Sequence, residues 1–560
     1  MKICYSILVA LTLVVEAKAN VTLPRIFGDN MVLQRNQQIP VWGWAKPGET
    51  IVVSFNKQKK TARADKSGDW KVNLSPETAG GPYALTIKGA NAIRFSNVLV
   101  GEVWICSGQS NMEWSLQAAA NAEQEIEAAD FAEIRSINIP KAISGTPEKD
   151  IKGGNWQVCN PETARNFSAV GYFFARKLYK ELKVPIGLIN TSWGGTQVES
   201  WISQKALEQS EEFKNVAASM PVLNLDSMNR AKETQLSKDF AVWKKELIQP
   251  EASDSWNKPD IDDSKWNKLE APGLWESQGL YAVDGKLLFR KTFVVDKAEA
   301  GKTAVLELGK IDDNDVTYVN GVKVGATEGY TALRYYTIPS GILKEGNNVI
   351  AIQVEDNAGG GGFWGDTGMK IIFGKREQSL AGSWSYKIQT LKPANLGAIV
   401  NPNQYPTLLF NAMVNPLIPY SVQGAIWYQG ESNTGRAAQY QKAFPLMIND
   451  WRQHWGQGNF PFYFVQLASF NAGGSTEKAK GYEWAELREA QTKTLSLPNT
   501  GMAVTTDIGD PKDIHPRNKQ DVGLRLALQA LNKTYNKTVI SSGPVFESMK
   551  AEGNQLILSF

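Results

Sequence analysis

Between residue 21 and about residue 98, apolar and polar residues alternate with the period of two that is typical of half-buried strands. Short runs such as IPVWGW, TIVVSF, DWKVNL and YALTIK are separated by turn clusters at Lys46–Gly48, Lys66–Gly68 and Gly80–Pro82. The pattern predicts a small N-terminal β-sandwich over residues 20–98.

After residue 98 the pattern changes to apolar runs without alternation, each followed by a segment with helical periodicity. The predicted strands are NVLVGEVWIC, VPIGLIN, SVQGAIWY, PFYFVQLA and GMAVTT. The predicted helices are MEWSLQAAANAEQEIEAAD, VGYFFARKLYKEL, AAQYQKAFPLMINDWRQHW, YEWAELREAQTKTL and RNKQDVGLRLALQALN. Strands that alternate with helices predict a three-layer α/β domain around a mostly parallel sheet.

A segment of different composition interrupts this domain between residues 239 and 373. It contains tryptophan-bearing polar loops and many strand-like runs, and Asn320-Gly321 between alternating residues predicts a tight hairpin. We expect a second β-sandwich, inserted so that the α/β domain is split into residues 99–238 and 374–537. The run Gly359–Gly362, followed by Phe363 and Trp364, would suit stacking on sugar rings. Residues 538–560 begin a further β element that looks incomplete.

The first 19 residues have the layout of a cleaved secretory signal. Lys2 precedes an apolar run from Ile7 to Val15, and small residues follow at Ala17-Lys-Ala19. No later run of about 20 apolar residues occurs, so we expect no membrane span. The sequence therefore predicts a secreted or periplasmic protein.

Charge and cysteine content exclude several classes of function. The formal net charge of +3 over 560 residues gives no indication of nucleic-acid binding. Beyond the predicted signal only Cys106 and Cys159 remain, which are too few for a disulfide scaffold, and they either pair or stay buried as thiols. No motif with metal-ligand spacing is present, so we expect no metal or other cofactor.

In an open α/β sheet, ligands bind beyond the carboxyl ends of the strands. Four predicted strand ends carry small or polar residues, in the segments SGQSNM, TSWGGT, YQGESN and DIGDPKDIHP. Together they offer a hydroxyl group, glycine N–H groups, a carboxylate with amides, and an Asp–His pair. This set is typical of a serine hydrolase.

Ser110 lies where a predicted strand gives way to a predicted helix. A lone serine at such a junction is usually an N-cap. The alternative is a nucleophile whose Oγ faces the crevice while helix N–H groups stabilise an oxyanion. The other three strand ends favour the nucleophile.

The chain holds two histidines, His454 and His515. His515 is the candidate general base, with Asp513 or Asp510 to orient its ring, and a structural histidine in a turn is the alternative. His454 lies near the end of a predicted helix. A histidine is favoured there by the helix dipole, without any catalytic role.

The two remaining strand ends supply candidates for binding the oxyanion. Gly194 and Gly195 either form a simple turn or present N–H groups to the oxyanion. Glu431 is either a solvated loop carboxylate or a second group that orients the base. In the latter case Gln429 or Asn433 would donate to the oxyanion.

These segments resemble those of the sialate O-acetylesterases, a group within the SGNH hydrolases that is close to the carbohydrate acetylesterases. The resemblance covers almost all of the chain beyond the signal and is carried by CSGQSNMEW, TSWGGTQVESW, IWYQGESNT, WAELREAQ and DIHPRNKQDVGLRLAL. It implies that Ser110 is the nucleophile, His515 the base and Asp513 its partner. It also matches Glu431 to a carboxylate of related acetylxylan esterases, and the inserted β region is similar to galactose-binding-like domains.

The sequence departs from the wider superfamily at two places. Lys512 stands three residues before the histidine, where the superfamily usually has Asp, so Asp510, Asp513 and Glu431 all remain candidates for orienting the base. The usual Gly-x-Asn-Asp block is replaced by QGESN, which leaves Gln429, Glu431 and Asn433 as alternatives for the side-chain oxyanion donor.

We therefore expect a carbohydrate O-acetylesterase that acts on an O-acetylated sugar or glycan, and the resemblance implies an acetylated sialic acid. An acetylesterase for xylan or another plant polysaccharide is the alternative within the same class. A non-catalytic carbohydrate-binding protein is the alternative of another class, and the retained Ser110, His515 and Asp513 argue against it.

Overall fold

The computed structural model describes residues 20–221, 224–246, 255–281, 283–357, 359–364, 368–393, 401–470 and 480–560. The predicted signal, residues 1–19, lies outside these ranges. The chain divides into two compact units, one formed by Met1–Leu223 and Val400–Phe560 and the other by Asn224–Ile399. The first unit is therefore assembled from two separate stretches of sequence.

A mostly parallel sheet forms the centre of the first unit. Its strands follow the order β25-β24-β23-β7-β10-β8-β9, and each neighbouring pair is parallel except β8 and β9. The strands are Ala92–Gly108 (β7), Phe131–Asn138 (β8), Gln157–Cys159 (β9), Ile186–Ser192 (β10), Gly424–Tyr428 (β23), Phe462–Val465 (β24) and Thr500–Ala503 (β25). The carboxyl ends of the parallel strands therefore lie at one edge, as the sequence predicts.

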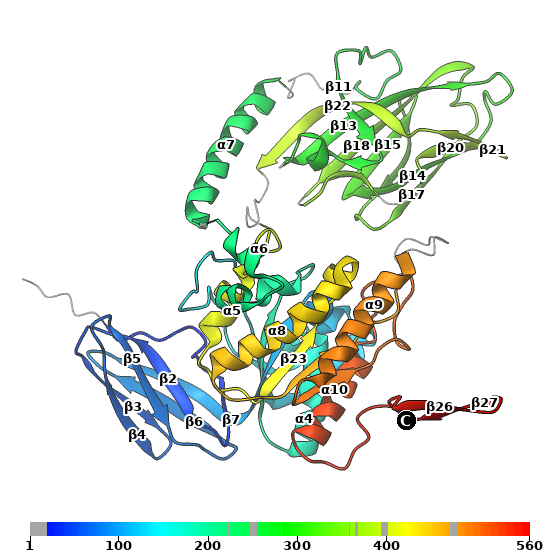
Figure 1. Cartoon of the computed structure of the whole chain (residues 1–560). Coiled ribbons are helices and arrows are strands. Elements are labelled where there is room, and N and C mark those ends of the chain that lie inside the picture. The colour runs from blue at the N-terminus through cyan, green and yellow to red at the C-terminus, as the bar shows by residue number, and fades with distance from the viewer. Residues whose placement is uncertain are drawn as a thin grey trace, which may run out of the picture. The chain divides into compact units, whose positions relative to one another are not determined.

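Helices cover both faces of this sheet (Figure 1). Side chains alternate along β7, so Trp104 and Cys106 join the apolar cluster that contains α4 and α10, while Val103 and Ile105 join the one that contains α8. The helices are Ser110–Glu113 (α1), Ala122–Glu127 (α2), Pro161–Ala164 (α3), Ala169–Leu182 (α4), Gln204–Gln209 (α5), Lys214–Ala218 (α6), Ala437–Trp455 (α8), Lys480–Lys493 (α9) and Lys519–Lys533 (α10). The unit thus has the helix–sheet–helix layering expected for this pattern.

The N-terminal strands are continuous with the central sheet. The first part of β7 pairs with β6, and its second part, Glu102–Gly108, pairs with β10. The predicted boundary between residues 98 and 99 therefore falls inside one strand. The remaining strands of this region are Val32–Gln34 (β1), Ile39–Trp44 (β2), Thr50–Phe55 (β3), Gln58–Arg63 (β4), Asp69–Leu74 (β5) and Gly80–Lys88 (β6).

The second unit contains two antiparallel sheets that share one apolar core. Their strand orders are β11-β22-β13-β18-β15-β16 and β12-β19-β14-β20-β21, with β17 beside β14. The unit extends beyond the predicted insert of residues 239–373 at both ends, since it includes helix α7 and strands β21 and β22. Its elements are Leu225–Glu246 (α7), Asn267–Ala271 (β11), Gly273–Leu274 (β12), Val283–Val295 (β13), Ala304–Asp312 (β14), Asn314–Val319 (β15), Val322–Thr327 (β16), Leu333–Ile338 (β17), Gly346–Asp356 (β18), Gly362–Trp364 (β19), Lys370–Phe373 (β20), Arg376–Ser379 (β21) and Gly382–Pro393 (β22).

Two hairpins test local predictions. Asn320 and Gly321 have φ angles of 50° and 80° and join the paired strands β15 and β16, which confirms the predicted tight turn. Near the C-terminus, Ser548–Glu552 (β26) and Gln555–Ser559 (β27) form a hairpin whose residues are all exposed.

One predicted helix is wrong. The segment 112–130 does not form a continuous helix but is divided between α1, a 3-10 turn at Leu116–Ala118 and α2. Ser115 pairs instead with Ser168 in an isolated bridge, and Asn121 adopts a φ of 55°. Contacts with a distant segment therefore override the local helical pattern.

Candidate active site

Ser110 is held at the junction of β7 and α1 by a close approach of two strands. Gly108, with a φ of +132°, passes so close to β23 that a Cβ atom there would lie 2.2 Å from the Tyr428 carbonyl oxygen. The next residue, Gln109, accepts hydrogen bonds at its Oε1 from the N–H groups of Gly430 and Ser432, both at 3.3 Å. Only glycine fits at position 108, and this explains part of the run of small residues.

His515 lies against this serine. Its Nε2 is 2.8 Å from Ser110 Oγ, although the two residues are 405 positions apart in the sequence. The Trp114 ring stacks on the imidazole, with centroids 4.9 Å apart and an interplanar angle of 18°. Burial and the nearby Lys519 ammonium lower the pKa of His515, and Asp513 partly opposes them. A neutral imidazole at hydrogen-bond distance from a hydroxyl can accept its proton.

The other histidine belongs to a different part of the unit. His454 lies in the last turn of α8, where its Nδ1 is 2.9 Å from the Asp450 carbonyl oxygen and 3.1 Å from the Asp450 carboxylate. This confirms the prediction of a helix-end residue. Of the two histidines, therefore, His515 is the one that contacts Ser110.

Asp513 contacts His515 through the backbone. One oxygen, Oδ1, accepts a 2.8 Å hydrogen bond from the His515 N–H and lies 3.9 Å from His515 Nδ1. That second distance is too long for a hydrogen bond. The neighbouring Asp510 accepts instead from the Lys512 N–H at 2.8 Å, within the same turn. Asp513 is thus the closer of the two aspartates to the imidazole.

Glu431 lies on a buried chain of hydrogen bonds behind the serine. Asn111, the residue after Ser110, donates to Glu431 Oε1 at 2.5 Å and to the Ile514 carbonyl at 3.0 Å. Lys519, the first residue of α10, donates to Asn111 Oδ1 at 2.5 Å. Since Ile514 precedes His515, this chain links the carboxylate to the backbone of the histidine.

Burial shifts both ionisable ends of this chain. It raises the pKa of Glu431, against the opposing effects of the Asn111 hydrogen bond and the Lys519 charge. It lowers the pKa of Lys519 to about 7, although Glu431 and Asp513 raise it. The ammonium also lies 5.6 Å from the ring centroids of Trp114 and Tyr428. The site therefore holds a cation whose protonation changes close to neutral pH.

Asn111 and Lys519 were missed by the sequence analysis. Asn111 stands next to the candidate nucleophile in SGQSNM. Lys519 carried a detectable signal, because a cation in the first turn of a helix is disfavoured by the helix dipole and calls for a separate explanation. In the structure that explanation is the buried bond to Asn111.

Gly194 passes directly beside the serine. A Cβ atom on Gly194 would lie 3.2 Å from Ser110 Cβ. Its N–H donates at 2.7 Å to Glu113 Oε2, and the other oxygen of Glu113 is 2.6 Å from Lys141 Nζ. Gly195 follows with a φ of +72°. The Gly194 N–H therefore already donates a hydrogen bond to a carboxylate oxygen in this structure.

Gln429 and Asn433 belong to a neighbouring buried cluster. Gln429 Nε2 donates to the Thr196 carbonyl at 3.0 Å and to Asn433 Oδ1 at 2.7 Å. Asn433 Nδ2 donates to Glu199 at 3.0 Å. These bonds join the loop after β23 to the loop after β10, and within the described residues they engage neither Ser110 nor its histidine.

Groups of three or more His, Cys, Asp or Glu side chains that could hold a metal ion do not occur among the described residues. Cys106 and Cys159 are both unpaired and buried, and burial raises the pKa of each thiol. Within the same ranges, no helix combines the length and the apolar character of a membrane span.

A family model and the relatives that align with most of the chain indicate one family. The model of a carbohydrate esterase family, the sialic acid-specific acetylesterases, matches residues 100–224 and 392–532. Sialate O-acetylesterases of Mus musculus and Homo sapiens are 25% and 23% identical to this chain over 92% and 95% of its length, and each match covers 74% of the relative.

A solved structure extends this similarity to the fold. The crystal structure of a carbohydrate acetylesterase from Xanthomonas citri aligns with 96% of this chain and 81% of its own, at 30% sequence identity and a TM-score of 0.60. The matched family segments contain Ser110, Gly194, Glu431 and His515. The chain belongs to the sialic acid-specific acetylesterase family of carbohydrate esterases, which are carboxylic-ester hydrolases.

Proposed function

We propose that this protein is a sialate O-acetylesterase that removes acetyl groups from sugar hydroxyls through a serine nucleophile. The observation that carries the proposal is the 2.8 Å contact between Ser110 Oγ and His515 Nε2 at the carboxyl edge of a parallel sheet. Membership of an esterase family supports the ester substrate, and the names of the mammalian relatives support the sialic acid.

In the proposed reaction, Ser110 Oγ attacks the acetyl carbonyl carbon while His515 Nε2 takes the hydroxyl proton. The tetrahedral intermediate collapses when His515 returns this proton to the departing sugar oxygen, which leaves an acetyl group on the serine. Water then attacks the acetyl-enzyme, with His515 again as base, and releases acetate. Burial lowers the pKa of His515, which keeps the imidazole neutral and ready to accept the proton.

The developing oxyanion needs donors beside Ser110. Gly194 is the proposed backbone donor because the residue packs against Ser110 and its N–H binds the carboxylate of the nearby Glu113. In the working site the acetyl oxygen would replace Glu113 Oε2 on this N–H, and Lys141 would retain the displaced carboxylate. The bonds of Gln429 and Asn433 favour a structural role for both.

The second unit is proposed to be a galactose-binding-like module. Its two antiparallel sheets and common core support this assignment. Phe363 is buried in that core, whereas Trp364 stays partly exposed with Lys310 Nζ 4.4 Å from its ring centroid.

A secreted or periplasmic location is also proposed, on the sequence of residues 1–19 alone.

Acetate release from a substrate panel tests the function. The panel contains O-acetylated sialic acids, acetylated xylan fragments and a small chromogenic acetate. The proposal predicts the highest kcat/KM on an acetylated sialic acid. A preference for xylan fragments would favour a plant-polysaccharide acetylesterase, and no acetate release from any member would favour a non-catalytic carbohydrate-binding protein.

A further inference from the structure

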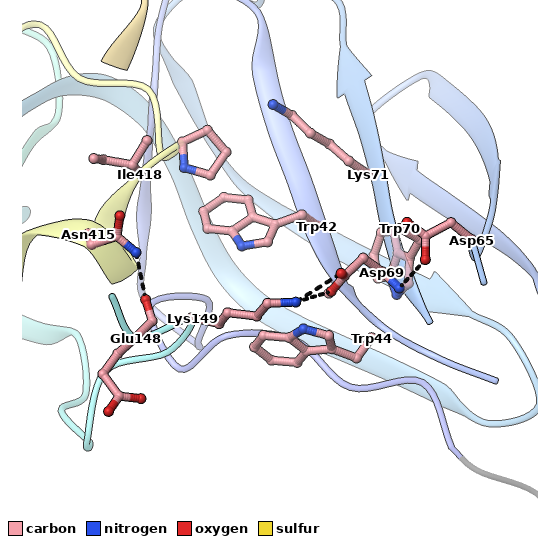
Figure 2. A pocket seen from close by; sticks show the side chains of 12 residues that line it. Trp42, Trp44, Asp65, Asp69, Trp70, Lys71, Glu148, Lys149, Asn415 and Ile418 are labelled. Carbon is pink, nitrogen blue, oxygen red and sulfur yellow. Dashed lines mark hydrogen bonds and ion pairs between the residues drawn. The ribbon is translucent and has the colours of Figure 1, made fainter. Parts of the chain in front are cut away.

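A surface pocket of about 450 Å³ lies in the first unit, away from the serine (Figure 2). It is walled by strands β2 and β5 of the N-terminal region and, opposite them, by residues 148–149 and 415–419. The residues around Ser110 and His515 form no part of its walls. Nothing in the proposed reaction uses this pocket.

Two half-exposed indole rings line the pocket. Trp42 and Trp44 occupy alternate positions of β2 and therefore point to the same face of the strand, opposite to the core residue Val41. Trp70 lies on β5 opposite Gly43, so its ring points to the other face of the strand pair, into the apolar core. Trp42 is held edge-on against Phe27, with ring centroids 4.7 Å apart, so its orientation is fixed before any ligand binds. Half-exposed indoles on a strand are flat apolar surfaces that suit stacking.

The pocket also contains polar groups that could bind hydroxyls. Lys149 Nζ lies 2.9 Å from the Asp69 carboxylate, and in the view of Figure 2 its ammonium sits between the Trp42 and Trp44 rings. This ion pair is exposed and therefore worth no more than about 1 kcal/mol, which a ligand can displace. The pocket wall thus offers a carboxylate and an ammonium group to a ligand.

The charges around the pocket nearly cancel. Lys71, Lys149 and the carboxylates of Asp65, Asp69 and Glu148 line it, and Lys152 Nζ lies 3.8 Å from the Glu148 carboxylate. Because neither sign of charge dominates, the pocket gives no particular attraction to an ionic ligand, and the charged rim disfavours an apolar peptide. A neutral sugar fits both features, because its C–H faces stack on indoles and its hydroxyls bond to carboxylates and ammonium groups.

We propose that this pocket is a second carbohydrate site, which binds neutral sugar residues by stacking on Trp44 and Trp42. The site is fixed relative to the catalytic edge, since β7 runs from the N-terminal region into the central sheet and both regions share one apolar core. Binding here would keep the enzyme on a glycan chain and raise the effective concentration of that chain's acetyl groups. The proposal concerns binding alone and does not depend on the esterase reaction.

Calorimetric titration of the full chain, in the Ser110→Ala background, tests the site without turnover. The ligands are a neutral xylo-oligosaccharide, a neutral galactosyl oligosaccharide and the sialylated form of the latter. We expect millimolar binding of a neutral ligand, no gain from sialylation that depends on Trp44, and at least about a tenfold loss of affinity for the neutral ligand in Trp44→Ala. Trp484→Ala is the matched control, since this half-buried indole lies on α9 outside the pocket. The affinity of this variant for the neutral ligand should equal that of the parent.

Trp44→Tyr keeps a smaller ring and should give an intermediate affinity, which also provides a test if Trp44→Ala does not fold. Folding is checked by circular dichroism and, with Ser110 restored, by hydrolysis of the small chromogenic acetate, which should be unchanged. Equal affinity in the parent and a folded Trp44 variant would overturn the proposal. So would the absence of binding by every neutral ligand up to about 10 mM, or stronger binding of the sialylated ligand that requires Trp44.

Discussion

Both compact units bury charged side chains, but these side chains have different surroundings. In the second unit, Arg334 and Asp315 are both 0% exposed and lie 3.0 Å apart. Arg334 also donates to three backbone carbonyls, and Asp315 accepts from Thr317 and Tyr336. The pair is enclosed within the second unit, and residues of that unit provide hydrogen-bond partners for both side chains.

In the first unit, the buried charges of Lys519 and Glu431 are separated by Asn111 and lie beside the reactive pair. Glu431 Oε2 has no hydrogen-bond partner among the described residues. Asn111 also donates to the Ile514 carbonyl, and the ring of the next residue, His515, faces Ser110. Burial of charge alone therefore does not identify a catalytic site; an incompletely satisfied charge beside a nucleophile and a base is the more specific sign.

The largest expected effect is loss of the reactive pair. Ser110→Ala and His515→Ala should each lower acetate release by at least about a thousandfold, and the double variant should be little worse, because the two residues act as one unit. Steady-state hydrolysis of the chromogenic acetate measures this. Ser54→Ala, on the sandwich strand β3, should keep full activity. Near wild-type turnover by Ser110→Ala would exclude it as nucleophile.

The enclosed pair of the second unit should matter for stability and not for chemistry. Arg334→Met leaves Asp315 buried without its cation and should cost about 3–5 kcal/mol of unfolding free energy in that unit. The Arg334→Met/Asp315→Leu double variant should recover part of this loss. Calorimetry gives the stability, and the small chromogenic acetate gives the activity. A folded Arg334→Met variant with a large loss of kcat would show that the enclosed pair contributes to catalysis.

Asp513→Asn should lower kcat by about tenfold, well below the effect of Ser110→Ala. The reason is that its carboxylate is 46% exposed and lies 3.9 Å from His515 Nδ1, so solvent screens its charge. Asp510→Asn is the control, because that side chain caps the same turn without approaching the ring. A loss as large as that of Ser110→Ala would mean that Asp513 bonds directly to the imidazole during turnover.

The smallest predicted effect is a displaced pH profile. The Lys519 charge contributes to the lowered pKa of His515, and Lys519, with a pKa of about 7, is mostly protonated over the acidic limb where His515 titrates. Removal of the cation in Lys519→Met should therefore raise the pKa of His515, although Asp513 and Glu431 remain. The acidic limb of kcat/KM should move to higher pH by up to about one unit.

Lys519→Arg keeps the charge and should leave the limb in place if the larger side chain is accommodated. Movement of the limb to lower pH in Lys519→Met would contradict the electrostatic explanation.

The sequence predicts best where local pattern and packing agree. The expected helix over residues 437–455 coincides with α8, since its apolar period is regular and Gly456 ends it in the left-handed conformation. The helix over residues 112–130 fails because Ser115 pairs with a strand-like partner at Ser168.

The distinction between local pattern and long-range packing applies to the site as well. Each strand end was identifiable from its own residues, and so were Ser110 and His515. The bond between Asn111 and Lys519 spans 408 positions and depends on the packing of α10 against the site, which no local pattern records. The distance between Asp513 and the imidazole is likewise set by the shape of a turn and not by its composition.

The central claim is that His515 activates Ser110 as the nucleophile. A fluorophosphonate ester, which reacts with activated serines, tests it when the full chain is labelled and its peptides are analysed by mass spectrometry. The account predicts one label, on Ser110, in parallel with loss of acetate release, and no label in His515→Ala. Label on a different serine, or full inactivation without label on Ser110, would contradict it.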